Sequence, residues 1–164
     1  MHLVYLLAGG NIDNTVSKYQ QLFLYIKERI GTIVSTSHYY ASPAWGYSSE
    51  HDFVNIALII KTNLSPEDTL QQCLDIEQLL GRKPHASHHY EDRSMDIDII
   101  FYDHLVIDTP HLQIPHPKMH IRNFVLTPLA EICPQKIHPI LNRTIIELKN
   151  LCPDKAIVKQ VDLT

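Results

Sequence analysis

The order of hydrophobic segments along the chain limits its fold more than any other feature. Two segments have apolar residues at helical spacing: one follows residues 11–14 and stops at Gly31, and the other starts at Ser65 and stops at Gly81. Strand-like segments flank them at residues 2–9, 32–41, 52–62 and 95–102. The resulting order is β-α-β-β-α-β, that of the ferredoxin-like split β-α-β fold, an antiparallel sheet with helices on one face.

The rest of the chain adds shorter pieces to this α+β core. Residues 103–120 are punctuated by proline and histidine and have room for a short hairpin. Helix-like patterns lie near residues 121–131 and 143–151, and the tail at 155–163 could add an edge strand. No repeat, low-complexity tract or linker divides the 164 residues, which suit one hydrophobic core. We therefore predict a single α+β domain over residues 1–164, with extra C-terminal helical segments.

Charge and cysteine content exclude several classes of protein. The net charge of −4 gives no overall positive field to recruit nucleic acid or an anionic membrane. Cys73, Cys133 and Cys152 lie far apart and outside any CxxC spacing, which indicates free thiols in a reducing compartment. No apolar run approaches the roughly 20 residues of a membrane span, and residues 1–9 are too short and lightly charged for a signal peptide. We expect a cytoplasmic protein.

The most informative polar feature is the acidic pair Asp96 and Asp98. Side chains alternate along a strand, so both carboxylates share one face, while Met95, Ile97, Ile99 and Phe101 are expected on the other. The two Cα atoms should lie about 6.6 Å apart, and ionised carboxylates that close repel each other unless a cation lies between them. Mg²⁺ bound by one or two carboxylates and substrate phosphates suits this arrangement. The alternative is a pair of acids that simply face solvent.

A basic, histidine-rich loop at residues 82–94 leads into this strand. Arg82 and Arg93 stand at its two ends, where they could donate to a polyphosphate; taken singly, each is more simply a solvated loop charge. The histidines His85, His88 and His89, with His111, His116 and His120 further on, leave a zinc-binding structural protein as another reading. No HExxH and no cysteine at finger spacing supports zinc.

Two further places could contact a ligand. Phe53 and Asn55 share one strand face, where an aromatic plane and an amide could hold a flat, nitrogen-rich heterocycle; a core phenylalanine beside a bonded asparagine is the alternative. Gly9-Gly10-Asn11 could let the backbone approach a ligand, or could be an ordinary turn in which Asn11 caps a helix. It is not a P-loop, because GxxxxGK[ST] is absent from the sequence.

In combination, these residues resemble a known family. The motifs are AGGN at 8–11, YxSPAWG at 40–46, DFVN at 52–55, GR at 81–82, RSMDIDI at 93–99, PHP at 115–117 and RNFVLTPLAEI at 122–132. Their order and spacing are similar to those of the 6-hydroxymethyl-7,8-dihydropterin pyrophosphokinases of folate synthesis. The resemblance covers residues 3–135.

The resemblance implies a ferredoxin-like α+β fold and transfer of the terminal diphosphate of ATP to the hydroxymethyl group of the dihydropterin, with AMP released. It implies two Mg²⁺ ions on Asp96 and Asp98, and phosphate-approaching catalytic roles for Arg82 and Arg93. Pterin contacts fall on Ser42, Pro43, Trp45, Phe53, Asn55 and Phe124. ATP contacts fall on Glu77, Tyr90, Ile99, His116 and Arg122. We expect a monomer with ATP and the dihydropterin as its partners.

The sequence departs from the family pattern mainly in the loop. The usual ending RWGPR is His89-Tyr90-Glu91-Asp92-Arg93 here, so that Tyr90 stands for the tryptophan and two acids replace Gly-Pro. Pro117 replaces a common tyrosine, and Gly10 a serine. A catalytically impaired relative is therefore one alternative. Another is a nucleic-acid-binding module of the same β-α-β-β-α-β order, although its phosphates would meet Asp96 and Asp98.

Overall fold

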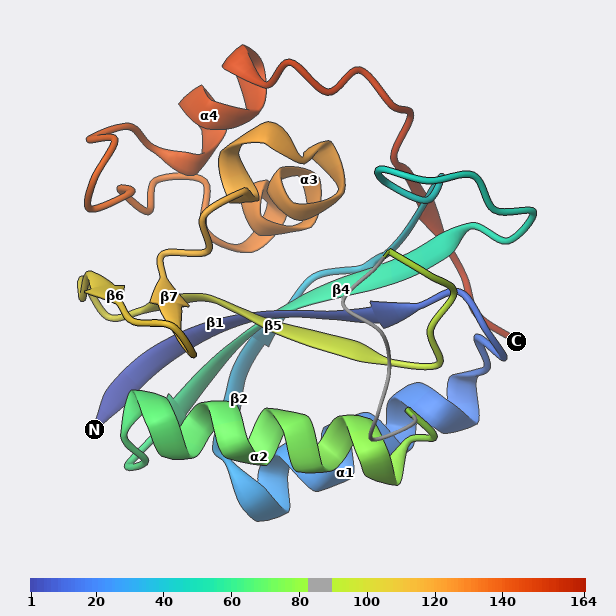
Figure 1. Cartoon of the computed structure of the whole chain (residues 1–164), viewed down its shortest axis with the longest axis horizontal. Helices are drawn as coiled ribbons and strands as arrows, with labels where there is room; N and C mark the ends of the chain where they lie inside the picture. The colour runs from blue at the N-terminus through green and yellow to red at the C-terminus, as the bar shows by residue number, and fades with distance from the viewer. Residues whose placement is uncertain (83–89) are drawn as a thin grey trace.

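The computed structural model describes residues 1–82 and 90–164 (Figure 1). The strands are β1 (His2–Gly10), β2 (Gly31–Thr36), β3 (Tyr39–Ser42), β4 (Phe53–Thr62), β5 (Asp96–Tyr102), β6 (Ile107–Asp108), β7 (Gln113–Ile114) and β8 (Lys159–Val161). The helices are α1 (Val16–Arg29), α2 (Pro66–Leu79), α3 (Asn123–Ile132) and α4 (Ile145–Leu151), with a 3₁₀ turn, η1 (Met119–Ile121). The predicted β-α-β-β-α-β order is confirmed.

Six strands form one antiparallel sheet in the order β5-β1-β4-β3-β8, and β2 also pairs with β4. The predicted single strand at 32–41 is therefore wrong, because β2 and β3 pair with different halves of the long strand β4. The break falls at Ser37, whose backbone N–H and side chain both bond to Ala57 of β4. The predicted edge strand in the tail is confirmed as β8.

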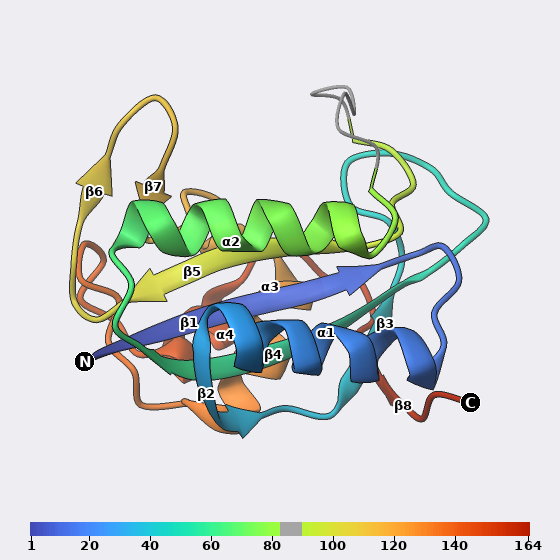
Figure 2. The ribbon, with the colours of Figure 1, turned by 90° about the horizontal axis from the view of Figure 1, so that it is seen from below.

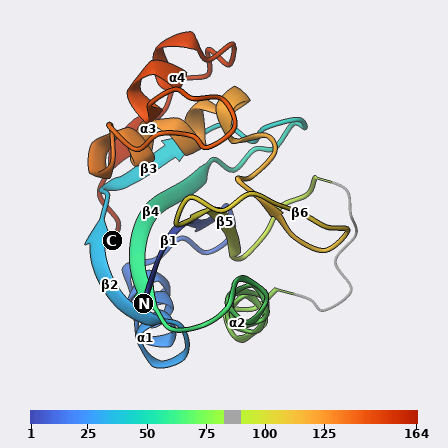
Figure 3. The same ribbon diagram turned by 90° about the vertical axis from the view of Figure 1, so that its left-hand side faces the viewer.

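Helices cover both faces of this sheet (Figure 3). The pair α1 and α2 lies side by side on one face, which Figure 2 shows from below, and buries one core cluster with β1, β4 and β5. The helices α3 and α4 cover the other face and bury a second cluster. The expectation of helices on one face holds for α1 and α2 alone. Burial on both faces explains why the central strand β1 is a continuous apolar run.

Local signals position the elements that carry the site. Helix α2 begins as predicted, with the Ser65 hydroxyl accepting from the Asp68 N–H at 3.0 Å and Pro66 in the first turn. It ends before Gly81, whose φ of +103° suits a residue without a Cβ. The predicted hairpin is the pair β6–β7, and His116 follows directly after it. No helix in the described part of the chain is long and apolar enough to cross a membrane.

Candidate active site

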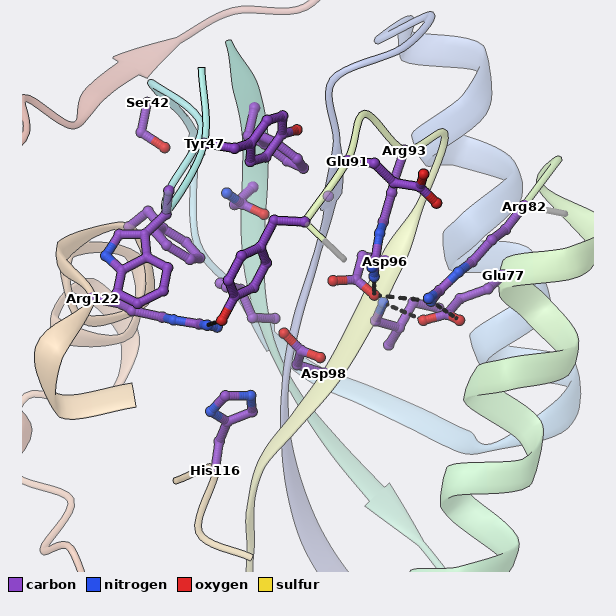
Figure 4. Close-up of a pocket in the computed structure, with 18 of the residues that line it drawn as sticks. Ser42, Tyr47, Glu77, Arg82, Glu91, Arg93, Asp96, Asp98, His116 and Arg122 are labelled. Atoms are coloured by element: carbon purple, nitrogen blue, oxygen red, sulfur yellow. Dashed lines mark hydrogen bonds and ion pairs between the residues drawn. The ribbon is translucent and has the colours of Figure 1, made fainter. Parts of the chain in front are cut away.

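A cavity of about 370 Å³ opens beside the start of β5 (Figure 4). Its volume falls within the range of small-molecule sites. Its walls come from segments far apart in the sequence: the end of β3 and the loop before β4, the end of α2, the start of β5, and the region from β7 to α3. It is lined by these residues from the sequence prediction: Ser42, Pro43, Trp45, Phe53, Asn55, Glu77, Arg82, Tyr90, Arg93, Asp96, Asp98, His116, Arg122 and Phe124.

The acidic pair lies on β5, and both carboxylates line the cavity, as alternation along a strand predicts. Asp96 Oδ1 accepts from Arg82 Nη1 at 3.1 Å and from Arg93 Nη1 at 3.3 Å. Asp98 projects into the cavity in Figure 4, and its carboxylate has no hydrogen bond or ion pair with the described residues. Burial and the charge of Asp96 raise the pKa of the Asp98 carboxyl, against the opposing effect of Arg122.

The expected apolar face of β5 is correct up to Ile99 and wrong for Phe101. The pairing with β1 shifts between Tyr5 and Leu6, so that one extra residue, Ile100, enters β5. Phe101 consequently packs in the cluster under α3 and α4, edge-on to Tyr5. Ile99 lies in the opposite cluster and is 5% exposed, so the structure does not bring this predicted ATP contact into the cavity.

Glu77 connects α2 to the outer edge of β5. Its Oε1 accepts from the Ile97 N–H at 2.8 Å, and its Oε2 accepts from Arg82 Nη1 at 2.6 Å. Burial and then Asp96 raise the pKa of Glu77 to about 7, while the Ile97 N–H and Arg82 act in the opposite direction. Glu77 therefore fixes both the edge strand and one of the two loop arginines.

An aromatic and cationic wall stands opposite the acids. The Arg122 guanidinium lies 4.3 Å from the centre of the Trp45 ring, and Arg122 Nη2 donates to the Tyr90 hydroxyl at 3.2 Å. Lys118 Nζ donates to the same hydroxyl at 2.8 Å, and this bond is the main cause of the lowered pKa of Tyr90. Tyr90 packs edge-on against Trp45.

His116 presents a neutral imidazole to the cavity. Its Nδ1 accepts from the Lys118 backbone N–H at 3.2 Å, which assigns the proton to Nε2. Burial, and after it the positive charge of Arg122, lowers the pKa of His116 to about 4. At neutral pH this residue therefore offers an N–H donor without a charge.

Two buried polar atoms in the cavity walls have no hydrogen-bond partner among the residues described: Ser42 Oγ and Arg122 Nε. Buried polar groups are nearly always bonded, so these two atoms need a partner that the described residues do not supply. Ser42 lies at the end with Phe53 and Asn55, whereas Arg122 stands between that end and the acids. The cavity thus has a mainly aromatic, uncharged end and a charged end.

Residues 5–134 match the family model of 7,8-dihydro-6-hydroxymethylpterin-pyrophosphokinase (HPPK). The chain belongs to this family. It is 33% identical over 141 residues to the 2-amino-4-hydroxy-6-hydroxymethyldihydropteridine pyrophosphokinase of Porphyromonas gingivalis, covering 85% of this chain and 95% of that one. It is 36% identical over 149 residues to the enzyme of the same name from Aquifex aeolicus, covering 91% of each.

Solved structures of the same family share the fold. A crystal structure of Plasmodium falciparum HPPK-DHPS with pteroate superposes with a TM-score of 0.72 at 17% identity, covering 92% of this chain and 42% of that chain. At that identity the likeness supports the ferredoxin-like fold alone. Membership of the HPPK family gives the nucleic-acid-binding alternative no support.

Several residues around the HPPK cavity were missed from the sequence. Leu70 and Leu74 line it with Glu77, and their spacing of four and three residues places all three on one face of α2. That spacing was a usable signal, because Glu77 interrupts an apolar stripe. Tyr47 and Glu91 also line the cavity, and only the loop conformations bring them there.

Gly9 lines the cavity, so its backbone borders the site as predicted. A Cβ on Gly9 would lie 2.2 Å from the Val54 carbonyl oxygen, so the close approach of β1 and β4 also requires a glycine there. Thr15, not Asn11, caps α1. His85, His88 and His89 lie outside the described residues. Among those described, no group of three or more His, Cys, Asp or Glu is arranged to hold a metal.

Proposed function

We propose that this chain transfers the β,γ-diphosphate of ATP to the hydroxymethyl oxygen of 6-hydroxymethyl-7,8-dihydropterin, with Mg²⁺ as cofactor and AMP as the second product. The observation that carries the proposal is one cavity with a carboxylate pair, Arg82 and Arg93 at one end, a mainly aromatic end with Phe53 and Asn55 at the other, and Arg122 between them. The first end suits a metal-bound triphosphate and the second a pterin. Family membership supports the same reaction.

The pterin is assigned to the end formed by Ser42, Trp45, Phe53, Asn55 and Phe124. A flat ring gains from aromatic faces, and its ring nitrogens and amide need matched donors and acceptors. The buried, unpartnered Ser42 Oγ and the buried Asn55 amide provide them. Pro43 lines the same end.

Asp96 and Asp98 fit a magnesium site. Mg²⁺ prefers carboxylate oxygens together with substrate phosphates, and a pair of protein carboxylates is enough for this type of site. The raised pKa of Asp98 reflects a partly buried carboxylate beside a second acid, an arrangement that a divalent cation would stabilise. When bound, two such ions would neutralise the triphosphate and orient it for in-line attack.

The remaining charged groups position the triphosphate. The hydroxymethyl oxygen loses its proton to solvent and forms a bond to the β-phosphorus, as the bond from that phosphorus to the α,β-bridging oxygen breaks and AMP leaves. Arg82 and Arg93 stand where they can donate to the oxygens that gain charge in this step. Arg122 and the Nε2–H of His116 also line the cavity and would add donors for ATP, beside Tyr90. Glu77 acts through Arg82 and β5.

The proposal describes residues 1–164 as one pyrophosphokinase domain that works as a cytoplasmic monomer, without nucleic acid or membrane. Mass measurement in solution by light scattering tests the monomer directly.

The deciding experiment is incubation with ATP, Mg²⁺ and 6-hydroxymethyl-7,8-dihydropterin, with nucleotide products separated by chromatography. We expect AMP in equal amount to pterin diphosphate, and no AMP when the pterin or Mg²⁺ is left out. Formation of ADP would indicate an ordinary kinase, and absence of any pterin-dependent product would refute the proposal.

A further inference from the structure

Two segments that border the cavity meet at the Asp92 carboxylate. Asp92 Oδ1 accepts from Ser49 Oγ at 2.8 Å and from the Tyr47 hydroxyl at 3.0 Å, both in the loop between β3 and β4. The same oxygen accepts from Asn11 Nδ2, at the end of β1, at 2.8 Å. Three donors from two other parts of the chain thus converge on one oxygen of an exposed side chain.

Asn11 attaches the same segment to the sheet. Its Oδ1 accepts from the Arg93 backbone N–H at 2.8 Å, and its own N–H donates to the Arg93 carbonyl oxygen at 2.9 Å. Asn11 is buried, and β1 is a central strand. The backbone before Arg93 is therefore anchored on a rigid element, and the Arg93 guanidinium reaches Asp96 from there.

A second contact joins the two segments further into the cavity. The Tyr90 ring packs edge-on against Trp45, with ring centres 5.7 Å apart. Gly46, the residue after Trp45, leaves room for the Tyr90 ring. Its φ is +81°, and a Cβ at this position would lie 3.1 Å from that ring. Tyr90 and Asp92 thus hold the same loop at two places, and the first of these contacts joins two residues that line the cavity, Tyr90 and Trp45.

We propose that Asp92 is a positioning residue, whose carboxylate fastens residues 90–93 to the loop at 43–52 and to β1, so that Tyr90, Trp45 and Arg93 are in place before a ligand binds. Asp92 is not among the residues that line the cavity, so it acts through those that are. The activity readout rests on the proposed function, whereas the fluorescence readout does not.

Trp45 makes this arrangement measurable, because it is the only tryptophan in the chain. Its ring is covered by Tyr90 and Arg122. In ligand-free protein, Asp92→Ala should increase quenching of Trp45 fluorescence by acrylamide, since the second contact loses its support. Asp92→Asn keeps an acceptor oxygen at the position of Oδ1, and it should restore most of the protection.

Steady-state kinetics should distinguish a positioning role of Asp92 from a role in the chemical step. If the assembled form falls to about a tenth of the population, the apparent Kd of each substrate alone rises about tenfold, and so does its KM at a low concentration of the other substrate, because the first ligand must select the minor form. The kcat at saturation should stay within about twofold, since bound ligands restore the same contacts. Ser49→Ala alone should raise KM less than Asp92→Ala does. In the double variant KM should be close to that of Asp92→Ala, because both substitutions remove the hydrogen bond between Ser49 and Asp92.

Glu50→Ala is the matched control. Glu50 is an exposed acid in the same loop, with no hydrogen bond or ion pair to the residues described. Circular dichroism and the unfolding midpoint verify that each variant is folded. Unchanged Trp45 quenching in folded Asp92→Ala, or a fall in kcat without a rise in KM, would overturn the proposal. If wild-type protein forms no AMP, the proposed function fails, and the quenching series still decides the role of Asp92.

Discussion

Asp98→Asn is the substitution with the most informative combination of effects. Asparagine has nearly the shape of aspartate and lacks its charge, so the change removes the repulsion with Asp96 and leaves the packing of β5 intact. Asp98 has no hydrogen-bond or ion-pair partner in the described chain that the substitution would deprive. Under the proposed function the same carboxylate binds Mg²⁺, so stability and activity should change in opposite directions.

The expected gain in stability follows from the spacing of the two acids. Alternate residues of a strand are about 6.6 Å apart, and at an effective dielectric constant of about 20 two such charges repel by about 2.5 kcal/mol. Arg122 offsets part of this repulsion. We therefore expect Asp98→Asn to raise the free energy of unfolding by about 1–2 kcal/mol at pH 7.5, or the Tm by about 3–6 °C.

The sign of the pH dependence follows from the raised pKa of Asp98. The folded protein holds the proton on this carboxyl more tightly than the unfolded chain, whose pKa is about 3.9. The protonated carboxyl therefore adds to the free energy of unfolding. This contribution is complete below the unfolded-state pKa and is lost as the pH rises through the folded-state pKa. The advantage of Asp98→Asn should therefore be large at pH 7.5 and disappear toward pH 4.

Urea unfolding at pH 7.5 and pH 4 measures the stability of the variant. Two assays measure its function: release of AMP, and the rise in Tm when Mg²⁺ and a non-hydrolysable ATP analogue are added. We expect turnover to fall by at least about 10³-fold and the Mg²⁺-dependent shift to be lost. Glu28→Gln, on the exposed face of α1, is the control and should change stability by less than about 0.5 kcal/mol. A variant with near-normal turnover, or one less stable than wild type at pH 7.5, would refute the reasoning.

Two further predictions concern donors at the charged end of the cavity. Arg82→Ala should lower kcat by about 10²–10³-fold with little change in KM, because under the proposed function the hydrogen bonds of Arg82 strengthen in the transition state. Steady-state kinetics measures both constants, and a rise in KM alone would contradict this prediction. The pKa of His116 is lowered from 6.5 to about 4 in the folded protein. The free energy of unfolding should therefore be higher above pH 6.5 than below pH 4 by up to about 3 kcal/mol, and this difference is lost as the pH falls from 6.5 to 4. Urea unfolding of His116→Gln at pH 4.5 and 7.5 should show a smaller difference than wild type, and an equal difference would argue against the buried neutral imidazole.

Periodicity was sufficient to predict the elements that pack in the two cores, because their burial follows from local patterns. Val54, Ile56, Leu58 and Ile60 face α1 and α2 as their alternation along β4 predicts. The break at Ser37 could not be predicted in this way, since it depends on hydrogen bonds to Ala57, twenty residues away along the chain. The register shift that moves Phe101 to the other face likewise belongs to the pairing of two strands.

The site residues also fall into two groups, those that local patterns predict and those that depend on contacts between distant segments. Alternation on a strand was enough to place Asp96 and Asp98 on one face, and helical spacing marked Glu77 as the exception in an apolar stripe. Arg122, by contrast, was found only through the family resemblance, because its position over Trp45 depends on how α3 meets the loop before β4. The contacts of Asp92 were not foreseen, since three loop conformations must agree before they form.

The charges at one end of the cavity restrict what the proposed reaction can bind first. Arg82 and Arg93 both donate to Asp96, so in the ligand-free protein these arginines already satisfy one acid, while Asp98 has none of these bonds. A free triphosphate would meet the carboxylate of Asp98, whose charge Arg122 offsets only in part, and a free cation would meet guanidinium groups. A magnesium–triphosphate complex would avoid both penalties, because Asp96 and Asp98 would hold the cation while Arg82 and Arg93 would donate to the phosphate oxygens. Under the proposed function we therefore expect the metal complex of ATP to bind more tightly than either component alone, and we expect the arginines to release Asp96 when it binds.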